Sequence, residues 1–271
     1  MTVETFFDLF LKELKESPAM TSYYKFLSDE KSFGFRKAYF IQRLQYVINQ
    51  IENKEHTVFD CGCGYGTTCL FLAMNGIKSF GTTLEFYFDR INERKKYWGQ
   101  FGDTDLFQID YSDLFDRKIE EKRFHYIVIQ DTLHHLEPIG EAVEILSNVL
   151  DDEGKLIVIE ENGRNVIQCA KLFLQRGNKR IITMWDERLQ KNILLGNENI
   201  RSLEEWGRVL AKSHLEIDQP SINFIRYKYP ASYANASIES IVGQEQRTAQ
   251  KYPFLRNYFF FGINFVAKKR V

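Results

Sequence analysis

The sequence predicts an α/β fold in which a mostly parallel sheet lies between two layers of helices. Short apolar segments at residues 57–61, 79–83, 106–109 and 126–130 are rich in residues that favour strands. Segments whose apolar residues recur at helical spacing separate them. Strands that alternate with helices in this way form βαβ units, and the parallel sheet that results is covered on both faces.

Two amphipathic helices are predicted before the first strand. Apolar residues lie on one helical face between Val3 and Leu14, and the same spacing returns from about Lys37 to Ile51. Both helices are expected to pack against the core. We therefore assign residues 1–55 to an N-terminal helical cap.

Residues 56–162 are predicted to form the core of the fold. Helical stripes at residues 70–77, 85–98 and 139–150 separate the strands. Residues 151–154 read Asp-Asp-Glu-Gly and are predicted to turn into a fifth buried strand at residues 155–159.

The regular alternation ends after this strand. Residues 163–200 are predicted to carry helical material with many basic side chains. A further helix is expected from Ser202, which forms a capping box with Glu205, to about Lys212.

The C-terminal part is predicted to complete the sheet and to add a lid. Segments 222–227 and 259–266 have strand composition and favour an antiparallel pair at the sheet edge. Residues 228–257, rich in Tyr, Ser, Ala and Gln, are expected to be an inserted lid. Residues 163–271 are thus predicted to be the remainder of the sheet with helical lid insertions.

The composition is that of an ordinary globular protein. Of the 271 residues, 44% are hydrophobic and 27% are charged, which excludes a disordered chain. Four cysteines are too few for a disulfide scaffold, and Cys61 and Cys63 lack a second Cys/His pair, so no metal site is predicted. The opening residues are acidic where a signal peptide would be basic, and a cytoplasmic location is expected.

The net charge of −1 is distributed unevenly along the chain. Residues 1–162 hold 18 basic and 28 acidic side chains, whereas residues 164–271 hold 18 basic and 9 acidic ones. Two interpretations stay open. The basic half faces an anionic ligand, a membrane or a nucleic acid, or the two halves compensate each other across an internal interface.

A glycine-rich turn at residues 58–66 is the most specific feature of the sequence. It reads Val-Phe-Asp-Cys-Gly-Cys-Gly-Tyr-Gly and joins the first strand to its helix. Glycine permits positive φ and lets a ligand lie against bare backbone, and the following helix N-terminus offers free N–H groups. An acid at Asp60 would repel a pyrophosphate but suits a cationic amino group.

This D-x-G-x-G-x-G turn resembles that of S-adenosylmethionine-dependent methyltransferases of the Rossmann-like class I. The resemblance covers roughly residues 56–162, is weak after them and is absent before them. It implies a Rossmann-like three-layer sandwich, with a mostly parallel seven-stranded sheet that ends in an antiparallel edge pair. It also implies S-adenosylmethionine as cofactor, S-adenosylhomocysteine as product and direct displacement of the methyl group from the sulfonium.

The resemblance also implies roles for the residues of the turn. Gly62, Cys63, Gly64 and Gly66 would lie along the methionine portion of the cofactor. Asp60 would contact its amino end, directly or through water. The alternative for Asp60 is an acid that only caps the turn.

The second predicted strand departs from the family pattern. The acid that usually grips the ribose is replaced by Thr83, within Gly-Thr-Thr-Leu-Glu. A Thr-Leu pair at this place resembles the cyclopropane-synthase branch of the family. Thr83 and Leu84 would line the ribose, and Glu85 would supply the carboxylate unless it is simply an acid at a helix N-terminus.

The third and fourth predicted strands match the family at their ends. Asp110 would accept a hydrogen bond from the adenine amino group, and the backbone N–H of Tyr111 would reach a ring nitrogen. Gln130 would face the methionine and sulfonium part. His125 stands where the family usually has Asp, which puts the usual capping role there in doubt.

Candidate catalytic residues follow the fourth strand. His134 and His135 belong to a Leu-His-His tail at the rim where an acceptor would approach, and a hydroxyl or carbon acceptor needs a base with a near-neutral pKa. This tail is common in the family without a catalytic duty. Glu160, Glu161 and Asn162, at the end of the fifth strand, are alternatives.

The expected acceptor is a small molecule, anionic or aromatic, and the protein is expected to be a monomer or homodimer. The segments expected to cover the acceptor contain several aromatic and arginine side chains: Tyr23, Tyr24, Phe35, Arg164, Trp185, Arg188, Tyr229 and Tyr233. These residues are alternatively only the core and surface of a helical cap.

Three other functions are weighed. A protein that binds S-adenosylmethionine or S-adenosylhomocysteine without catalysis is favoured slightly by Thr83 and by the lack of an unmistakable base. A nucleic-acid methyltransferase is disfavoured, because residues 130–133 read Gln-Asp-Thr-Leu rather than an Asn/Asp-Pro-Pro-aromatic turn. An NAD-dependent oxidoreductase is disfavoured by the glycine spacing and by Asp60.

Overall fold

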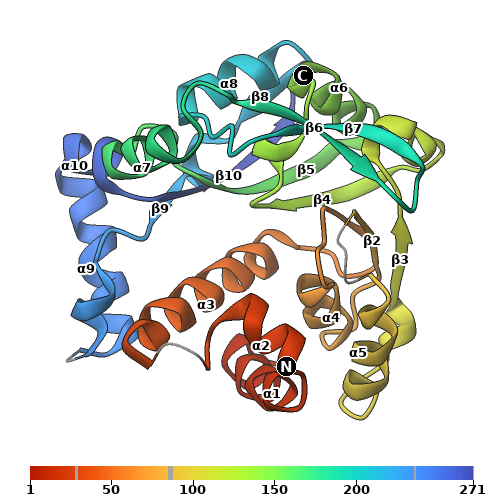
Figure 1. The fold of residues 1–271 in the computed structure, drawn as a ribbon, viewed down its shortest axis with the longest axis horizontal. Coiled ribbons are helices and arrows are strands. Elements are labelled where there is room, and N and C mark those ends of the chain that lie inside the picture. The colour runs from red at the N-terminus through yellow and green to blue at the C-terminus, as the bar shows by residue number, and fades with distance from the viewer. Residues whose placement is uncertain (28–29, 85–87, 235, 271) are drawn as a thin grey trace.

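The computed structural model describes residues 1–27, 30–84, 88–234 and 236–270. Its strands are β1 (Val58–Cys61), β2 (Ser79–Thr83), β3 (Phe107–Tyr111), β4 (Phe124–Gln130), β5 (Leu150–Glu161), β6 (Ile181–Asp186), β7 (Lys191–Gly196), β8 (Leu215–Ile217), β9 (Asn223–Ile225) and β10 (Gly262–Lys269). Its α-helices are α1 (Val3–Glu16), α2 (Pro18–Tyr24), α3 (Phe33–Gln50), α4 (Thr67–Ala73), α5 (Arg90–Trp98), α6 (Ile139–Val149), α7 (Val166–Arg176), α8 (Leu203–Ala211), α9 (Ile238–Lys251) and α10 (Pro253–Phe259). Figure 1 shows their arrangement.

The main sheet has the order β3-β2-β1-β4-β5-β10-β8, and β9 also pairs with β10. The first five strands in the chain are parallel, whereas β10 is antiparallel to β5, β8 and β9. The predicted α/β class, with a mostly parallel sheet and an antiparallel edge, is confirmed.

The number of strands is eight rather than the predicted seven. The difference arises at one edge of β10, where β8 pairs with residues 267–269 and β9 pairs with residues 262–264. Two short strands therefore share the position that one strand was expected to fill.

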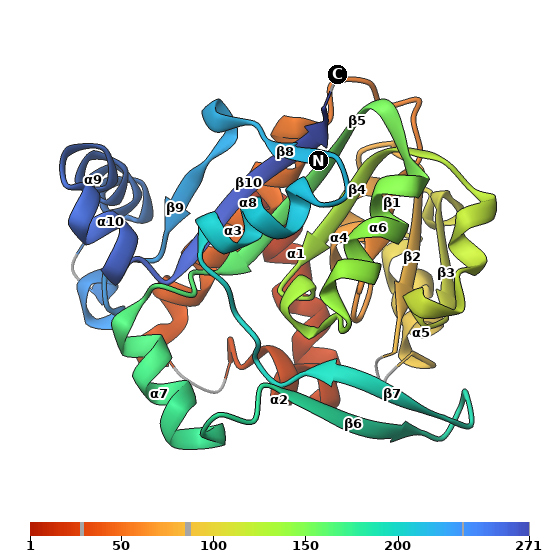
Figure 2. The ribbon, with the colours of Figure 1, turned by 90° about the horizontal axis from the view of Figure 1, so that it is seen from above.

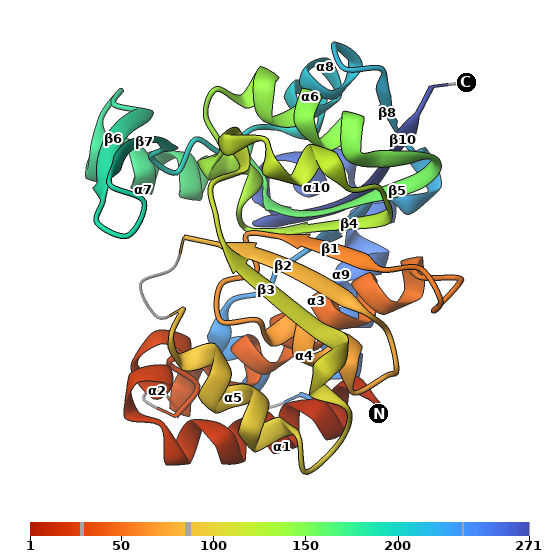
Figure 3. The same ribbon diagram turned by 90° about the vertical axis from the view of Figure 1, so that its right-hand side faces the viewer.

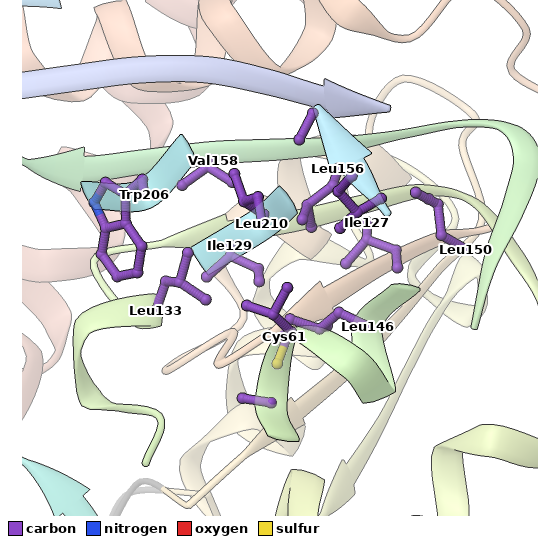
Figure 4. Close-up of a cluster of buried hydrophobic side chains, with 14 of the residues drawn as sticks. Cys61, Ile127, Ile129, Leu133, Leu146, Leu150, Leu156, Val158, Trp206 and Leu210 are labelled. Atoms are coloured by element: carbon purple, nitrogen blue, oxygen red, sulfur yellow. The ribbon is translucent and has the colours of Figure 1, made fainter. Parts of the chain in front are cut away.

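Helices cover both faces of this sheet, as the edge-on view in Figure 3 shows: α6 and α8 lie on one side, and α1 to α5 lie on the other. Alternate residues of β1 point to opposite sides, since Phe59 and Cys61 belong to the core under α6 and α8 while Val58 belongs to the core under α3. Figure 4 shows the first of these cores, where Trp206 and Leu210 of α8 lie near Ile129 and Val158 of the sheet.

The N-terminal helices pack through aromatic side chains. Phe6 and Phe10 of α1 are fully buried, and Phe6 stacks on Trp98 of α5 with ring centroids 4.4 Å apart. Phe10 stacks on Phe40 of α3 at 5.2 Å. These contacts attach α1 to the same side of the sheet as α5.

The predicted domain boundaries, after residue 55 and after residue 162, stay a prediction.

The segment predicted to be helical at residues 163–200 is only partly helical. After α7, the antiparallel strands β6 and β7 form a separate two-stranded ribbon, which stands beside the main sheet in Figure 2. The β-favouring runs Ile-Ile-Thr-Met-Trp and Asn-Ile-Leu-Leu account for the ribbon.

The turn predicted at residues 151–154 is also absent, because these residues continue β5. The pairing of β5 with β4 shifts between Phe124, which faces Leu150, and Tyr126, which faces Lys155. An irregularity in the strand therefore absorbs the polar residues that suggested a turn.

Among the described residues, no helix is both long and apolar enough to cross a membrane.

Candidate functional site

The predicted cofactor-binding residues lie along the carboxyl ends of four neighbouring strands. In the register of the sheet, Cys61 of β1 lies beside Thr82 of β2, and Thr82 lies beside Asp110 of β3. On the other side of β1, Asp60 lies beside Val128 of β4, two residues before Gln130. One edge of the sheet thus brings these positions together, which is where open α/β sheets bind ligands.

The glycine turn has a backbone that requires glycine at Gly62. Its φ is +78°, and an added Cβ would lie 2.3 Å from the side chain of Thr132, which follows β4. The N–H groups of Gly62 and Cys63 both donate to Thr82 O at 2.9 Å. The turn is therefore held tightly between β2 and the end of β4.

Gly64 differs from Gly62 in having free space beside it. Its φ is +53°, yet no heavy atom among the described residues lies within 4 Å of an added Cβ. Gly66 is the N-cap of α4, so the N-terminus of that helix begins directly after the open backbone. This combination leaves room for a ligand against the main chain.

Asp60 is a buried carboxylic acid next to this turn, with 2% of its surface exposed. Burial raises the pKa of Asp60, whereas the hydrogen bond from Cys69 and the charge of Arg43 lower it. Burial has the larger effect, and the pKa is raised to about 7. Cys69 Sγ donates to Asp60 Oδ2 at 3.4 Å. A cation placed beside this carboxyl would favour its ionised form.

The ends of β2 and β3 present a second group of predicted residues. Thr83 is buried, Asp110 is exposed, and the Tyr111 hydroxyl donates to Asp186 Oδ2 of the β6–β7 ribbon at 2.6 Å and to Leu84 O at 3.3 Å. The ribbon therefore reaches the end of β3. Glu85 lies outside the described residues.

The end of β4 is linked to the helix after the glycine turn. Gln130 Nε2 donates to Thr68 Oγ1 of α4 at 2.5 Å. Thr132 Oγ1 donates to Gln130 O at 2.9 Å, and its side chain is the one that fills the space next to Gly62. The amide of Gln130 is thus held by α4, and its predicted role toward the cofactor stays a prediction.

A polar cluster that the sequence did not reveal lies beside Asp131. Arg43 of α3 forms an ion pair with this carboxylate at 2.7 Å, and the hydroxyl of Tyr39 donates to it at 3.2 Å. Arg226 lies over the ring of Tyr39, 4.4 Å from its centroid. An arginine within the apolar stripe of α3 was the signal available, but its partner could not be identified without the fold.

His134 is buried against Glu160. Its Nδ1 lies 2.5 Å from Glu160 Oε2, and 3% of its surface is exposed. Burial lowers the pKa of His134, but the charge of Glu160 and its hydrogen bond outweigh burial and raise the pKa to about 9.

His135 is more open, and its side chain is 39% exposed. Its Nδ1 lies 2.7 Å from Gly196 O, at the end of β7. His125 lies apart from both, at the start of β4, where it stacks on His56 at 4.3 Å.

The other residues at the end of β5 have structural partners. Glu161 Oε2 accepts from Gln168 at 2.5 Å, and its other oxygen lies 3.7 Å from Arg226. Asn162 donates to the carbonyl oxygens of Asn257 and Phe260, both at 2.9 Å. Asn162 thus ties the strand to the end of α10.

A second unpredicted connection reaches the glycine turn from the N-terminal helices. Arg94 Nη1 donates to Tyr65 O at 2.6 Å, between Gly64 and Gly66, and its other nitrogens contact Glu13 of α1. The sequence of α5 indicates only a charged, mostly helical stretch, so nothing in it showed that one of its arginines is buried.

The residues expected to cover an acceptor are spread over several places. Tyr23 packs edge-on against Tyr65 of the turn at 4.7 Å, and Tyr24 hydrogen-bonds Thr67 at 2.6 Å. Phe35 packs edge-on against Tyr233, with ring centroids 5.7 Å apart. The guanidinium carbon of Arg188 lies 4.6 Å from the ring centroid of Tyr111. Arg164 pairs with Glu204, and Trp185 and Tyr229 are exposed.

A cavity of about 380 Å³ lies between the start of α8, β9, α9 and α10. Asn162, one of the alternative catalytic candidates, and Arg164, one of the residues expected to cover an acceptor, line it, whereas the predicted cofactor-binding residues and the two histidines do not. The cavity thus lies past the carboxyl end of β5, away from the glycine turn.

Comparison with known proteins agrees with this geometry. Residues 59–158, which run from the glycine turn through β5, match the family model described as "Methyltransferase domain". These residues belong to the class I methyltransferase family. S-adenosylmethionine is the cofactor of this family. A comparison with curated proteins gives no match.

Solved structures share the fold of the methyltransferase domain at low sequence identity. A putative sarcosine dimethylglycine methyltransferase from Galdieria sulphuraria is 12% identical, with a TM-score of 0.56 over 85% of this chain and 86% of that one. A SAM-dependent methyltransferase from Archaeoglobus fulgidus is 16% identical, with a TM-score of 0.54 over 84% and 92%. A geranyl diphosphate methyltransferase bound to GPP and sinefungin is 14% identical, with a TM-score of 0.56 over 85% and 77%.

Proposed function

We propose that this methyltransferase transfers the methyl group of S-adenosylmethionine to a small-molecule acceptor by direct displacement. The observation that carries the proposal is the open backbone at Gly64, with the buried carboxyl of Asp60 next to the same turn. A sulfonium amino acid needs both a surface without side chains and a counter-charge for its amino group.

The donor would lie along the carboxyl edge of the sheet. Gly62, Cys63, Gly64 and Gly66 shape the backbone for its methionine part, and Asp60 would face its amino group. When bound, the donor supplies an activated methyl group, and the protein supplies alignment. Gln130, held by α4, lies at the same turn.

The adenosine would extend toward β2 and β3. Thr83 ends β2 beside Tyr111, Leu84 follows it, and the exposed Asp110 lies beside Thr82. We propose that Asp110 and the backbone of Tyr111 bind the adenine and that Thr83 and Leu84 line the ribose. The role of Glu85 stays a proposal from the sequence.

Two observations support a small acceptor. The cluster of Arg43, Tyr39 and Arg226 beside Asp131 offers cationic and aromatic groups just past β4, which suits a small anionic or aromatic molecule. Two of the solved structures with this fold are named for small acceptors, a sarcosine or dimethylglycine and a geranyl diphosphate.

The proton acceptor that we favour among the predicted pair is His135. Its side chain is partly exposed, and its Nδ1 is taken by Gly196 O, which leaves Nε2 for an acceptor. His134 is buried against Glu160 and is less accessible.

A turnover assay tests the proposal. The purified protein is incubated with S-adenosylmethionine and a panel of small anionic, aromatic and amine acceptors, and S-adenosylhomocysteine is quantified. Acceptor-dependent product supports the proposal. Tight donor binding with no product on any acceptor favours a protein that binds the cofactor without catalysis, and product only with RNA or DNA contradicts a small acceptor.

A further inference from the structure

Three metal-binding side chains from distant parts of the chain meet just past β4. His134 and His135 belong to the short helix after β4, and Glu198 follows β7. One ligand atom of each lies within 4.8 Å of the others. Nε2 of His134 is 3.7 Å from one carboxylate oxygen of Glu198, and Nε2 of His135 is 4.0 Å from the other.

Both imidazoles are oriented by a hydrogen bond at the opposite nitrogen. His134 Nδ1 lies 2.5 Å from the Glu160 carboxylate, and His135 Nδ1 lies 2.7 Å from Gly196 O. An acceptor at Nδ1 fixes a proton there and turns Nε2 toward Glu198. Metal-binding histidines usually have such a partner, because it sets the tautomer and the ring orientation.

The backbone on one side of Glu198 is fixed by close contact with the histidines. An added Cβ on Gly196 would lie 2.0 Å from His134 O, so only glycine permits the ribbon to approach this closely. Leu195 forms an isolated bridge with Leu136, directly after the histidine pair.

The backbone on the other side of Glu198 is fixed by Glu137. Its carboxylate accepts from Asn199 Nδ2 at 2.6 Å and from Arg201 at 2.8 Å. Arg176 also donates to the carbonyl of Glu198 at 3.1 Å. Glu198 therefore projects from a held segment rather than from a free loop.

The cluster is open on one side. The side chains of His135 and Glu198 are 39% and 43% exposed, whereas His134 is 4% exposed. An ion can thus enter from solvent and reach a buried ligand. The position facing solvent is left for a water molecule or another oxygen ligand.

We propose that Nε2 of His134, Nε2 of His135 and the carboxylate of Glu198 bind one divalent transition-metal ion, with zinc as the best match. Two imidazoles and one carboxylate form the ligand set of zinc sites that keep an open fourth position. The ligands need only move closer by about 0.5–1.5 Å to reach the separations of a tetrahedral site. The sequence predicted no metal site, because that prediction considered only the cysteines as ligands and Glu198 is far along the chain from the two histidines.

Metal binding has a consequence for the proposed base. Nε2 of His135 cannot both bind an ion and accept a proton from an acceptor, so His135 can act as the base only in the metal-free protein. The ion also displaces any proton on Nε2 of His134, so binding releases protons. The proposal concerns the metal alone and does not depend on methyl transfer.

Cobalt titration of the full-length protein tests this site. Chelator-treated protein is titrated with Co²⁺, and a visible d–d band of the intensity typical of four- or five-coordinate cobalt is expected, which Zn²⁺ abolishes. Glu198→Gln and His135→Ala should each weaken Co²⁺ binding at least about 10-fold, and Glu160→Gln should weaken it about 10- to 100-fold through His134.

Matched variants separate this site from adventitious binding. His214→Asn and Glu187→Gln change an exposed histidine and an exposed glutamate outside the cluster and should leave the band unchanged. Circular dichroism confirms that each variant is folded. Absence of a band in the wild-type protein overturns the proposal. So does a band that survives both Glu198→Gln and His135→Ala but is lost in His56→Gln, since that result places the ion at the His56–His125 pair.

Discussion

Arg94 of α5 and Glu13 of α1 form a buried ion pair in which two guanidinium nitrogens lie 2.7 and 2.8 Å from the carboxylate. The same arginine donates to Tyr65 O in the glycine turn, and Trp98 donates to Glu13. The first helix of the chain is thereby connected to the backbone that we propose as the donor site. The Arg94–Glu13 pair therefore connects the packing of α1 with the position of the glycine turn.

The variant Glu13→Gln tests this connection. It leaves the Arg94 charge buried without its partner, so the free energy of unfolding should fall by about 3 kcal/mol. Because Arg94 also holds Tyr65, donor affinity should fall as well. Urea unfolding and calorimetric titration measure the two effects, with the exposed Glu16→Gln on the same helix as control. Full donor affinity in a destabilised Glu13→Gln would show that the pair serves folding alone.

Gly64→Val should abolish donor binding in a folded protein. A β-branched residue at a φ of +53° costs roughly 1–2 kcal/mol, and its side chain occupies the space that we assign to the donor. Gly76→Val is the matched control, because Gly76 has a φ of +75° and no described atom within 4 Å of an added Cβ. Both variants should lose similar stability, but only Gly64→Val should lose donor affinity. Equal donor affinity in the two would remove Gly64 from the site.

Local patterns predicted the parts of the fold that depend on local physics. The glycine turn, the strand β1 before it, the helix α4 after it and the capping box at Ser202 each depend on residues close together in the chain. The β6–β7 ribbon escaped prediction because its buried residues, Asp186, Ile193 and Gly196, do not alternate regularly with the exposed ones.

The contacts that connect distant segments could not be predicted. Arg43 with Asp131, Arg94 with Glu13 and Glu198 with the histidine pair each join residues whose separation in the chain carries no signal. A single sequence shows which side chains can ionise, but only the sheet order shows which of them meet.

The Arg43–Asp131 pair should contribute measurably to stability because both side chains are shielded, with 22% and 35% of their surfaces exposed. A double-mutant cycle with Arg43→Met and Asp131→Asn should give a coupling energy of about 1 kcal/mol. Asparagine suits the positive φ of 47° at residue 131, so the variant changes the charge and not the backbone. The exposed pair Arg90–Glu93 should give a coupling close to zero. Equal coupling in both pairs would contradict a special role for Asp131.

In the metal-free protein, His135→Ala should lower turnover and spare donor affinity. General base catalysis contributes about 10²- to 10⁴-fold, so a loss of at least about 10²-fold is expected with the best acceptor. The donor Kd should stay within error, because no contact of His135 reaches the glycine turn among the described residues. The exposed His214→Ala is the control. An unchanged rate in His135→Ala excludes it as the base.

Asp60 should make both stability and donor binding depend on pH. Its pKa of about 7 in the folded protein is above the ordinary aspartic acid value of 3.8, so between these values the folded state binds a proton that the unfolded state has lost. This group therefore makes stability fall as the pH rises from about 4 to 7, by up to about 1.4 kcal/mol per pH unit. Asp60→Asn removes this contribution, so the variant should be more stable than the wild type at about pH 8 and lose that advantage toward pH 4.

Binding of the donor should favour the ionised form of Asp60, whereas burial favours the protonated form. A cationic amino group beside the carboxyl stabilises its ionised form, together with Arg43 and the Cys69 hydrogen bond that already act on it. Donor affinity should therefore increase as the pH rises through 7 in the wild type and be weak and independent of pH in Asp60→Asn. Calorimetric titration at about pH 6 and pH 8 measures this. A wild-type affinity that is equal at both values, with unfolding curves that still report the raised pKa, would show that the amino group of the donor lies away from Asp60.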